Sequence, residues 1–184
     1  MASTEANEIS KDIIEGCVAG NRKHQKIVYE NLYQTMYAIC LRYSNSSDEA
    51  KDLLQDGFMK LFKKVKKYNV DAPFTIWVKR LFINHCIDYV RSAYKKYVYY
   101  FDEVYSDDSV DPFEEEDHTE EISKSDVFEA MNKIRADYRL ILNLFAIENL
   151  SHAEIAEKLN IQEASSRSKL SRARVALKKE LNRE

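Results

Sequence analysis

The sequence predicts an all-α protein built from two small helical domains that are joined by an acidic linker. Most apolar residues recur at the three- to four-residue spacing of amphipathic helices. The chain of 184 residues has only 3 glycines and 2 prolines, which argues against a turn-rich β protein. Hydrophobic residues make up 45% of the chain, enough to fill packed cores.

Charge divides the chain into three segments. Residues 98–126 carry a net charge of −11, whereas residues 1–97 carry +5 and residues 127–184 carry +3. A high density of like charge is typical of an extended, solvated linker. We therefore expect a basic domain at 1–97, an acidic linker at 98–124 and a second basic domain at 125–184.

The first domain is expected to begin with two helices. Residues 5–15 can form a short helix, and Gly16 and Gly20 bracket a break after it. A longer helix follows from Arg22 to Tyr43, with apolar residues at helical spacing along one side.

A third helix is expected from about Asp48 to Lys67. Ser46 or Ser47 can cap it, and acidic residues occupy its first turn, where the helix dipole favours them. Its last turns hold a cluster of lysines, Lys63, Lys64, Lys66 and Lys67. This cluster is either a solvated helix end or a surface that faces phosphates.

A fourth helix is expected from about Phe74 to Tyr94, introduced by Pro73. It interleaves aromatic residues with cations, the mixture that single-stranded nucleic acid requires, because bases stack on aromatic rings while cations follow the backbone. The alternative is a core helix with a charged outer face.

The last domain is expected to open with two helices, Ser125–Ala136 and Tyr138–Ile147. The second is apolar on nearly all sides, which indicates a buried helix.

A helix-turn-helix is expected to complete the chain. Ser151 and Glu154 have the spacing of a capping box, Asn160 suits a left-handed helix stop, and a second helix begins near Gln162. The second helix is rich in serine, arginine and lysine, which suits duplex DNA. The alternative is an ordinary helical hairpin whose charged face is merely solvated.

No feature of the sequence indicates catalysis, a metal or another cofactor. Cys17, Cys40 and Cys86 are widely spaced and are expected to be reduced core residues. His85 and His152 have no second ligand at a useful spacing. With neither a signal-peptide pattern nor a long apolar run, the chain is expected to be cytoplasmic.

In order, these pieces resemble the extracytoplasmic-function subfamily of bacterial sigma factors, the promoter-recognition subunits of RNA polymerase. The resemblance lies in three stretches: DEAKDLLQDGFMKLFKKV, FTIWVKRLFINHCIDYVRS and YRLILNLFAIENLSHAEIAEKLNIQEASSRSKLSRARVALKKEL. They are similar to the region-two helix, the promoter-melting helix and region four of that family. The style of the sequence resembles members from the Bacteroidetes group.

The resemblance implies three sets of site residues. Core polymerase would be bound by Asp52, Leu53, Gln55, Asp56 and Phe58. The separated strands of the minus-ten element would be bound by Lys66, Lys67, Phe74, Trp77, Lys79, Arg80 and Asn84. The minus-thirty-five duplex would be bound by Ser165, Ser166, Arg167, Lys169, Arg172 and Arg174.

The resemblance also implies that the chain acts without a small-molecule substrate and that an anti-sigma factor, often membrane-anchored, inhibits it. Three positions depart from the family pattern, Asn160, Gln162 and Ser166, and the last stands where an aliphatic residue is usual. The main rival is a stand-alone helix-turn-helix regulator whose first half senses a ligand or dimerises. A third hypothesis is an enzyme that uses the linker carboxylates.

Overall fold

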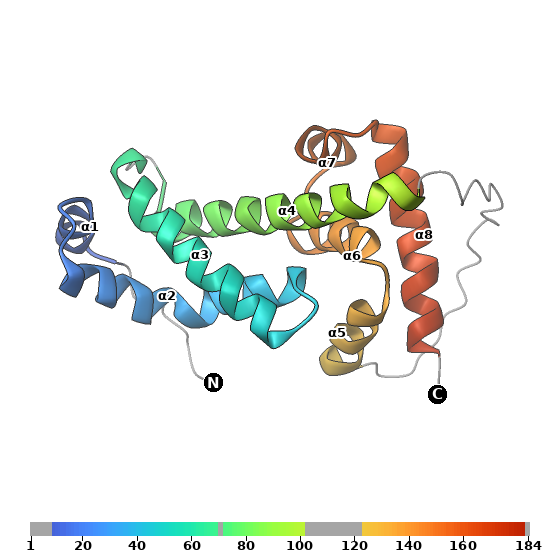
Figure 1. Ribbon diagram of the computed structural model, residues 1–184, viewed down its shortest axis with the longest axis horizontal. Coiled ribbons are helices and arrows are strands. Elements are labelled where there is room, and N and C mark those ends of the chain that lie inside the picture. Colours follow the sequence, from blue (N-terminus) through green and yellow to red (C-terminus); the bar gives the residue numbers. More distant parts are fainter. Residues whose placement is uncertain (1–8, 70–71, 102–122, 183–184) are drawn as a thin grey trace. The chain divides into compact units, whose positions relative to one another are not determined.

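The computed structural model describes residues 9–69, 72–101 and 123–182. The regular elements in these ranges are all helical, which confirms the predicted fold class (Figure 1). The chain divides into two compact units, Met1–Asp88 and Tyr89–Glu184, and the division falls inside helix α4.

The first unit is built from helices whose starts are capped by polar side chains. Its elements are α1 (Lys11–Val18), α2 (Arg22–Tyr43), α3 (Ser47–Lys64), the single 3-10 turn η1 (Val65–Lys67) and the beginning of α4 (Phe74–Phe101). The Asn21 side chain accepts a hydrogen bond from the backbone N–H of Lys23, and the Ser46 hydroxyl accepts one from Glu49. These caps fix where α2 and α3 start, and the bounds of α2 are those predicted.

The predicted helix ends differ from the structure at α1, which continues through Gly16 to Val18, and at α4. Helix α4 continues to Phe101 rather than ending near Tyr94, so residues 98–101 of the predicted acidic linker are helical. The rest of that segment, 102–122, lies outside the described residues, as does the beginning of the helix predicted at 5–15.

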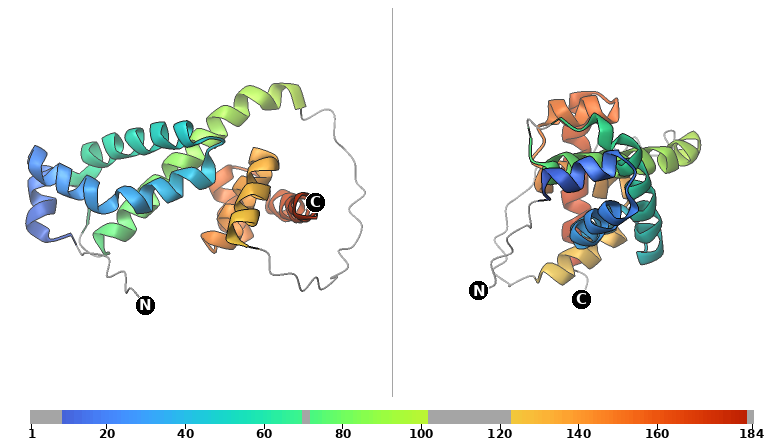
Figure 2. Two further views of the ribbon diagram at one scale, coloured as in Figure 1. Left: turned by 90° about the horizontal axis from the view of Figure 1, so that it is seen from below. Right: turned by 90° about the vertical axis from the view of Figure 1, so that its left-hand side faces the viewer.

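The core of the first unit forms where α2, α3 and α4 meet. Helices α2 and α3 lie side by side, and α4 packs on α3 (Figure 2). The edge of the Phe82 ring meets the Phe58 ring with centroids 5.2 Å apart, and Phe82 is fully buried. A Cβ atom added to Gly57 would lie 2.3 Å from the Phe82 ring, so the missing side chain at residue 57 is what lets the two helices cross closely.

We therefore expect Gly57→Ala to destabilise the first unit, although alanine favours a helix. Overpacking a filled core costs about 1–3 kcal/mol, and the gain in helix propensity returns only about 1 kcal/mol. Urea unfolding should show a net loss in the free energy of unfolding. The double variant Gly57→Ala/Phe82→Leu should lose less than the sum of the two single variants, because the shorter side chain makes room for the new methyl group. Strict additivity would contradict the close crossing.

The second unit packs its last helix against the three helices that precede it. Its elements are the end of α4, then α5 (Lys124–Lys133), α6 (Ala136–Leu142), the π-helical turn η2 (Asn143–Ile147), α7 (His152–Leu159) and α8 (Glu163–Leu181). Helix α8 contacts α5, α6 and α7. It buries Leu170 and Ala173, whereas Leu177 and Leu181 are only half-buried.

The apolar stretch predicted as one buried helix, Tyr138–Ile147, is irregular. It changes from α6 to the wider turn η2, where the backbone N–H of Glu148 donates to the carbonyl of Asn143. Residues 140–144 are buried, but the wider turn carries the end of the stretch outwards, and Ile147 is 42% exposed. Inserted π turns often occur at functional positions.

Candidate nucleic-acid interface

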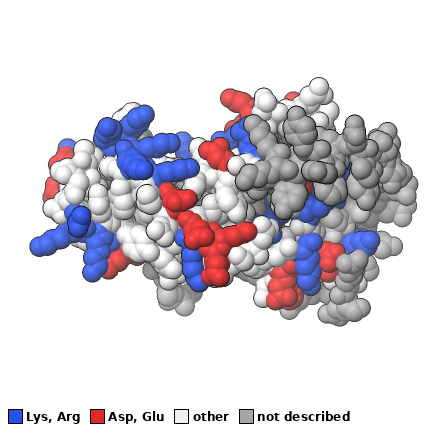
Figure 3. Space-filling view, in the orientation of Figure 1, with Lys and Arg blue, Asp and Glu red and all other residues white. Residues whose placement is uncertain are grey.

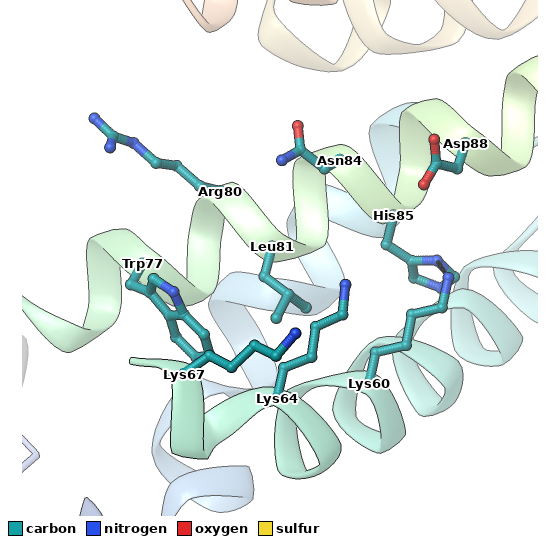
Figure 4. Close-up of a pocket in the computed structure, with 9 residues that line it drawn as sticks. All are labelled: Lys60, Lys64, Lys67, Trp77, Arg80, Leu81, Asn84, His85 and Asp88. Carbon is teal, nitrogen blue, oxygen red and sulfur yellow. Dashed lines mark hydrogen bonds between the residues drawn. The ribbon is translucent and has the colours of Figure 1, made fainter. Parts of the chain in front are cut away.

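A basic cavity lies between the end of α3 and the first half of α4. Its volume is about 270 Å³, and it is open to solvent. Lysine side chains from α3 and η1 extend into the cavity, and Trp77 lies at one end of it (Figure 4). The lining residues are Lys60, Lys64, Lys67, Trp77, Arg80, Leu81, Asn84, His85 and Asp88. We call this the α3–α4 cavity.

One wall of the α3–α4 cavity is fixed by a hydrogen bond between Lys60 and His85. The Lys60 ammonium donates to Nδ1 of His85 across 2.8 Å. Burial of the ring, and then the charge of Lys60, lower the pKa of His85, while Asp56 and Asp88 act in the opposite direction. The ring is therefore neutral at neutral pH and accepts the bond, which holds the ammonium group at the edge of the cavity.

The aromatic rings of Phe74 and Tyr68 support the Trp77 end of the α3–α4 cavity. The Phe74 ring lies 5.1 Å from Tyr68 and 5.8 Å from Trp77, measured between centroids, and the Tyr68 hydroxyl donates to the carbonyl of Ala72. Phe74 is only 5% exposed because Tyr68 and Trp77 cover it, and its contact with DNA stays a prediction. Trp77 is half-buried and presents its remaining surface to the cavity.

The other predicted minus-ten residues are exposed, and they fall into two groups. Lys67, Arg80 and Asn84 line the α3–α4 cavity together with Trp77. Lys66 and Lys79 are exposed but do not line it.

Two lysines of the α3–α4 cavity are absent from the predicted minus-ten set. Lys60 and Lys64 lie one helical turn apart on α3, which places them on one face together with the following Lys67. The spacing of these lysines was the signal that could have identified the face.

The exposed side of α3 changes from acidic to basic along its length. Lysine and arginine side chains gather over the end of α3 and the start of α4, and acidic side chains gather over the first half of α3 (Figure 3). Of the predicted polymerase-binding residues, Asp52, Gln55 and Asp56 are exposed on this acidic side. Leu53 and Phe58 are each 3% exposed and belong to the core, and their contact with the polymerase stays a prediction.

The second unit contains the predicted helix-turn-helix. Ser151 and Glu154 form both hydrogen bonds of a capping box at the start of α7. Asn160 ends that helix in the left-handed conformation, with φ 54° and ψ 51°, and the N–H of Ile161 donates back to the carbonyl of Ala156. Both sequence signals are confirmed, and they set the angle at which the chain enters α8.

The predicted minus-thirty-five residues on α8 differ in how accessible they are. Arg167 and Arg174 are exposed, and Arg167 pairs with Glu163 one turn earlier at 2.6 Å. Lys169 reaches the buried Asp137 carboxylate at 3.2 Å.

Ser165 and Arg172 are half-buried, whereas Ser166 is fully buried. The Ser166 hydroxyl is bonded inside the unit, to His152, and its contact with DNA stays a prediction.

The cysteines contribute to the core. Cys17, Cys40 and Cys86 are buried, and a hydrogen bond to Cys40 together with burial raises the pKa of the Cys86 thiol. A thiol with a raised pKa is a poor nucleophile. Within the part of the chain that the structure describes, no group of three or more His, Cys, Asp or Glu residues is arranged to hold a metal ion. None of the described helices is long and apolar enough to cross a membrane.

Comparison with known proteins identifies the same two regions. The family profile of Sigma-70 region 2 matches residues 28–96, and that of Sigma-70, region 4 matches residues 125–177. The first therefore covers the α3–α4 cavity and the acidic side of α3, and the second covers most of the helix-turn-helix.

Curated relatives match most of the chain. The chain is 30% identical over 156 residues to the ECF RNA polymerase sigma factor SigM of Bacillus subtilis, covering 85% of this chain and 94% of that protein. It is 29% identical over 156 residues to SigW of the same organism, covering 79% and 82%. A solved sigma factor, RpoE of Bartonella quintana in complex with the anti-sigma factor NepR, shares the fold: the TM-score is 0.51 at 22% identity, over 86% of this chain and 97% of that one.

Proposed function

Because the chain belongs to the ECF family of RNA polymerase sigma factors, we infer that it directs core RNA polymerase to specific promoters, where it initiates transcription by binding and opening the DNA. It is a regulatory initiation factor. The main support for separate binding of unpaired and duplex DNA is the α3–α4 cavity. It combines four cationic residues with a tryptophan in the region-two unit.

The α3–α4 cavity binds the separated strands of the minus-ten element. Its size, about 270 Å³, supports the entry of a single nucleotide rather than a duplex. Lys64, Lys67 and Arg80 would contact backbone phosphates, and Trp77 offers a ring face on which a base can stack. Lys66 and Lys79, outside the cavity, would contribute long-range attraction to the DNA.

The acidic side of α3 binds the polymerase clamp through Asp52, Gln55 and Asp56. These side chains are exposed, with Gln55 and Asp56 each about one turn after Asp52, and they precede the basic end of the same helix. The reversal of charge along one helix supports two different partners, a basic protein surface at the start and nucleic acid at the end.

Helix α8 reads the minus-thirty-five element as intact duplex in the major groove. Arg167, near the start of the helix, is suited to base edges, and Arg172 and Arg174 to phosphates. Lys169, which is held by Asp137, would contribute charge and position rather than a base contact.

An anti-sigma factor, either soluble or anchored in the membrane, holds the chain inactive in the cytoplasm. The likeness in fold to RpoE, whose structure contains the anti-sigma factor NepR, supports this proposal.

Transcription with purified core polymerase tests the proposed function. Core polymerase supplied with this chain, across a library of promoters, should initiate at a defined set of sites that core polymerase alone does not use. If the chain binds DNA but confers no specific initiation, the stand-alone regulator is the correct hypothesis.

A further inference from the structure

Four side chains of the second unit form a chain of contacts that leaves α8 and returns to it. Oγ of Ser166, on α8, lies 3.0 Å from Nδ1 of His152, the first residue of α7. The His152 ring stacks on the Phe145 ring of η2, with centroids 4.9 Å apart and planes at 26°. The guanidinium carbon of Arg174, again on α8, lies 5.7 Å from the centre of the Phe145 ring. We call these four residues the His152 bridge.

Each contact in the His152 bridge restricts the next one. Ser166 is fully buried, and a buried hydroxyl requires a hydrogen-bond partner, which the His152 ring supplies. The hydrogen bond fixes the plane of the imidazole, and stacking against the imidazole restricts the orientation of the Phe145 ring. The ring face of Phe145 then provides a platform for the Arg174 cation.

Arg174 is the member of the bridge that can reach DNA. It is exposed, and among the described residues it forms no ion pair. It lies past the midpoint of α8, whereas a recognition helix contacts base edges with its N-terminal residues. An arginine in that position is suited to a backbone phosphate, and a guanidinium that is already oriented loses less conformational freedom on binding.

We propose that Ser166, His152 and Phe145 are positioning residues that hold the Arg174 guanidinium ready for a phosphate of the upstream duplex. This inference rests on the proposed function, in which α8 binds the minus-thirty-five element. It also gives Ser166 a role that an aliphatic residue at the same position could not perform, because only the hydroxyl can bond His152.

Salt dependence of duplex binding separates positioning from stability. Holoenzyme assembled from core polymerase and each full-length variant is titrated onto labelled upstream duplex over a series of salt concentrations. Removing one phosphate contact makes the slope of log K against log salt shallower by about 0.9. A variant that is merely less folded loses active protein but keeps the slope.

Three single variants and one control are needed. Arg174→Ala should weaken binding about three- to tenfold and make the slope shallower by about one phosphate contact. Ser166→Ala breaks the hydrogen bond and keeps the stack, and His152→Phe does the same from the other side. Each substitution should weaken binding about two- to fivefold and make the slope shallower. The double variant should bind no worse than either single variant, because both substitutions remove the same hydrogen bond. Ser168→Ala, an exposed serine on the same helix, should match the unchanged protein.

The outcomes distinguish the inference from the proposed function. If Arg174→Ala alters the slope and Ser166→Ala alters neither affinity nor slope, the His152 bridge does not position the arginine and the inference fails. An unchanged slope for Arg174→Ala also overturns it, because Arg174 then touches no phosphate. If the holoenzyme with the unchanged chain does not bind the upstream duplex, the proposed function of α8 is wrong, and the inference falls with it. Unfolding of each variant by urea gives the folded fraction that corrects the affinities.

Discussion

Replacing Lys64 and Arg80 together by alanine is expected to reduce strand opening at a promoter about a hundredfold, while the closed complex forms almost normally. The two residues line the α3–α4 cavity from different helices, so both side chains would contact the same short stretch of unpaired backbone. A hydrogen bond to a charged group contributes about 1.5 kcal/mol or more, and two of them correspond to about a hundredfold in an equilibrium constant. Permanganate reactivity of unpaired thymines measures opening, and footprinting at low temperature measures the closed complex.

The matched control removes the same charge from the same helices outside the α3–α4 cavity. Lys63 and Lys79 are exposed on α3 and α4 but do not line it. The variant Lys63→Ala/Lys79→Ala should therefore open DNA within a few-fold of the unchanged protein. Equal losses in the two double variants would mean that net charge, rather than the cavity, drives opening.

The sequence predicted well where a structure depends on neighbours in the chain. The start of α3 follows from Ser46, and the stop of α7 follows from Asn160, because a cap is a contact between residues two to four apart. The capping box of Ser151 and Glu154 is of the same kind. Such features depend on residues that lie close together in the sequence, so the order of the residues is enough to predict them.

Burial caused by distant residues could not be predicted in the same way. Periodicity identified Phe74 and Ser166 as members of helices but not the side chains that cover them. Ser166 bonds to His152 from another helix, and Lys60 reaches His85 across 25 positions of the chain. Both Phe74 and Ser166 are of a type that suits DNA, but tertiary packing buries their side chains.

Phe74→Ala is expected to lower the free energy of unfolding of the first unit by about 3–5 kcal/mol, the usual cost of removing a buried phenylalanine ring. Phe74 is 5% exposed, and its ring lies between Tyr68 and Trp77. These contacts join the first turn of α4 to the segment that follows η1, so a cavity there would loosen the start of the helix. Trp77 is the only tryptophan of the chain and touches Phe74, which makes its fluorescence a direct probe of urea unfolding.

Asn84→Ala is the counterpart that separates stability from DNA contact. Asn84 is exposed on the same helix and lines the α3–α4 cavity, so its loss should change the free energy of unfolding by only about 0.5 kcal/mol. We expect this variant to form closed complexes and to open them poorly, whereas Phe74→Ala should lose both in proportion to its unfolded fraction. If Phe74→Ala instead unfolds at the urea concentration of the unchanged protein and still fails to open DNA, the ring must leave its buried position to stack on a base. The aromatic cluster would then be part of the binding site rather than its support.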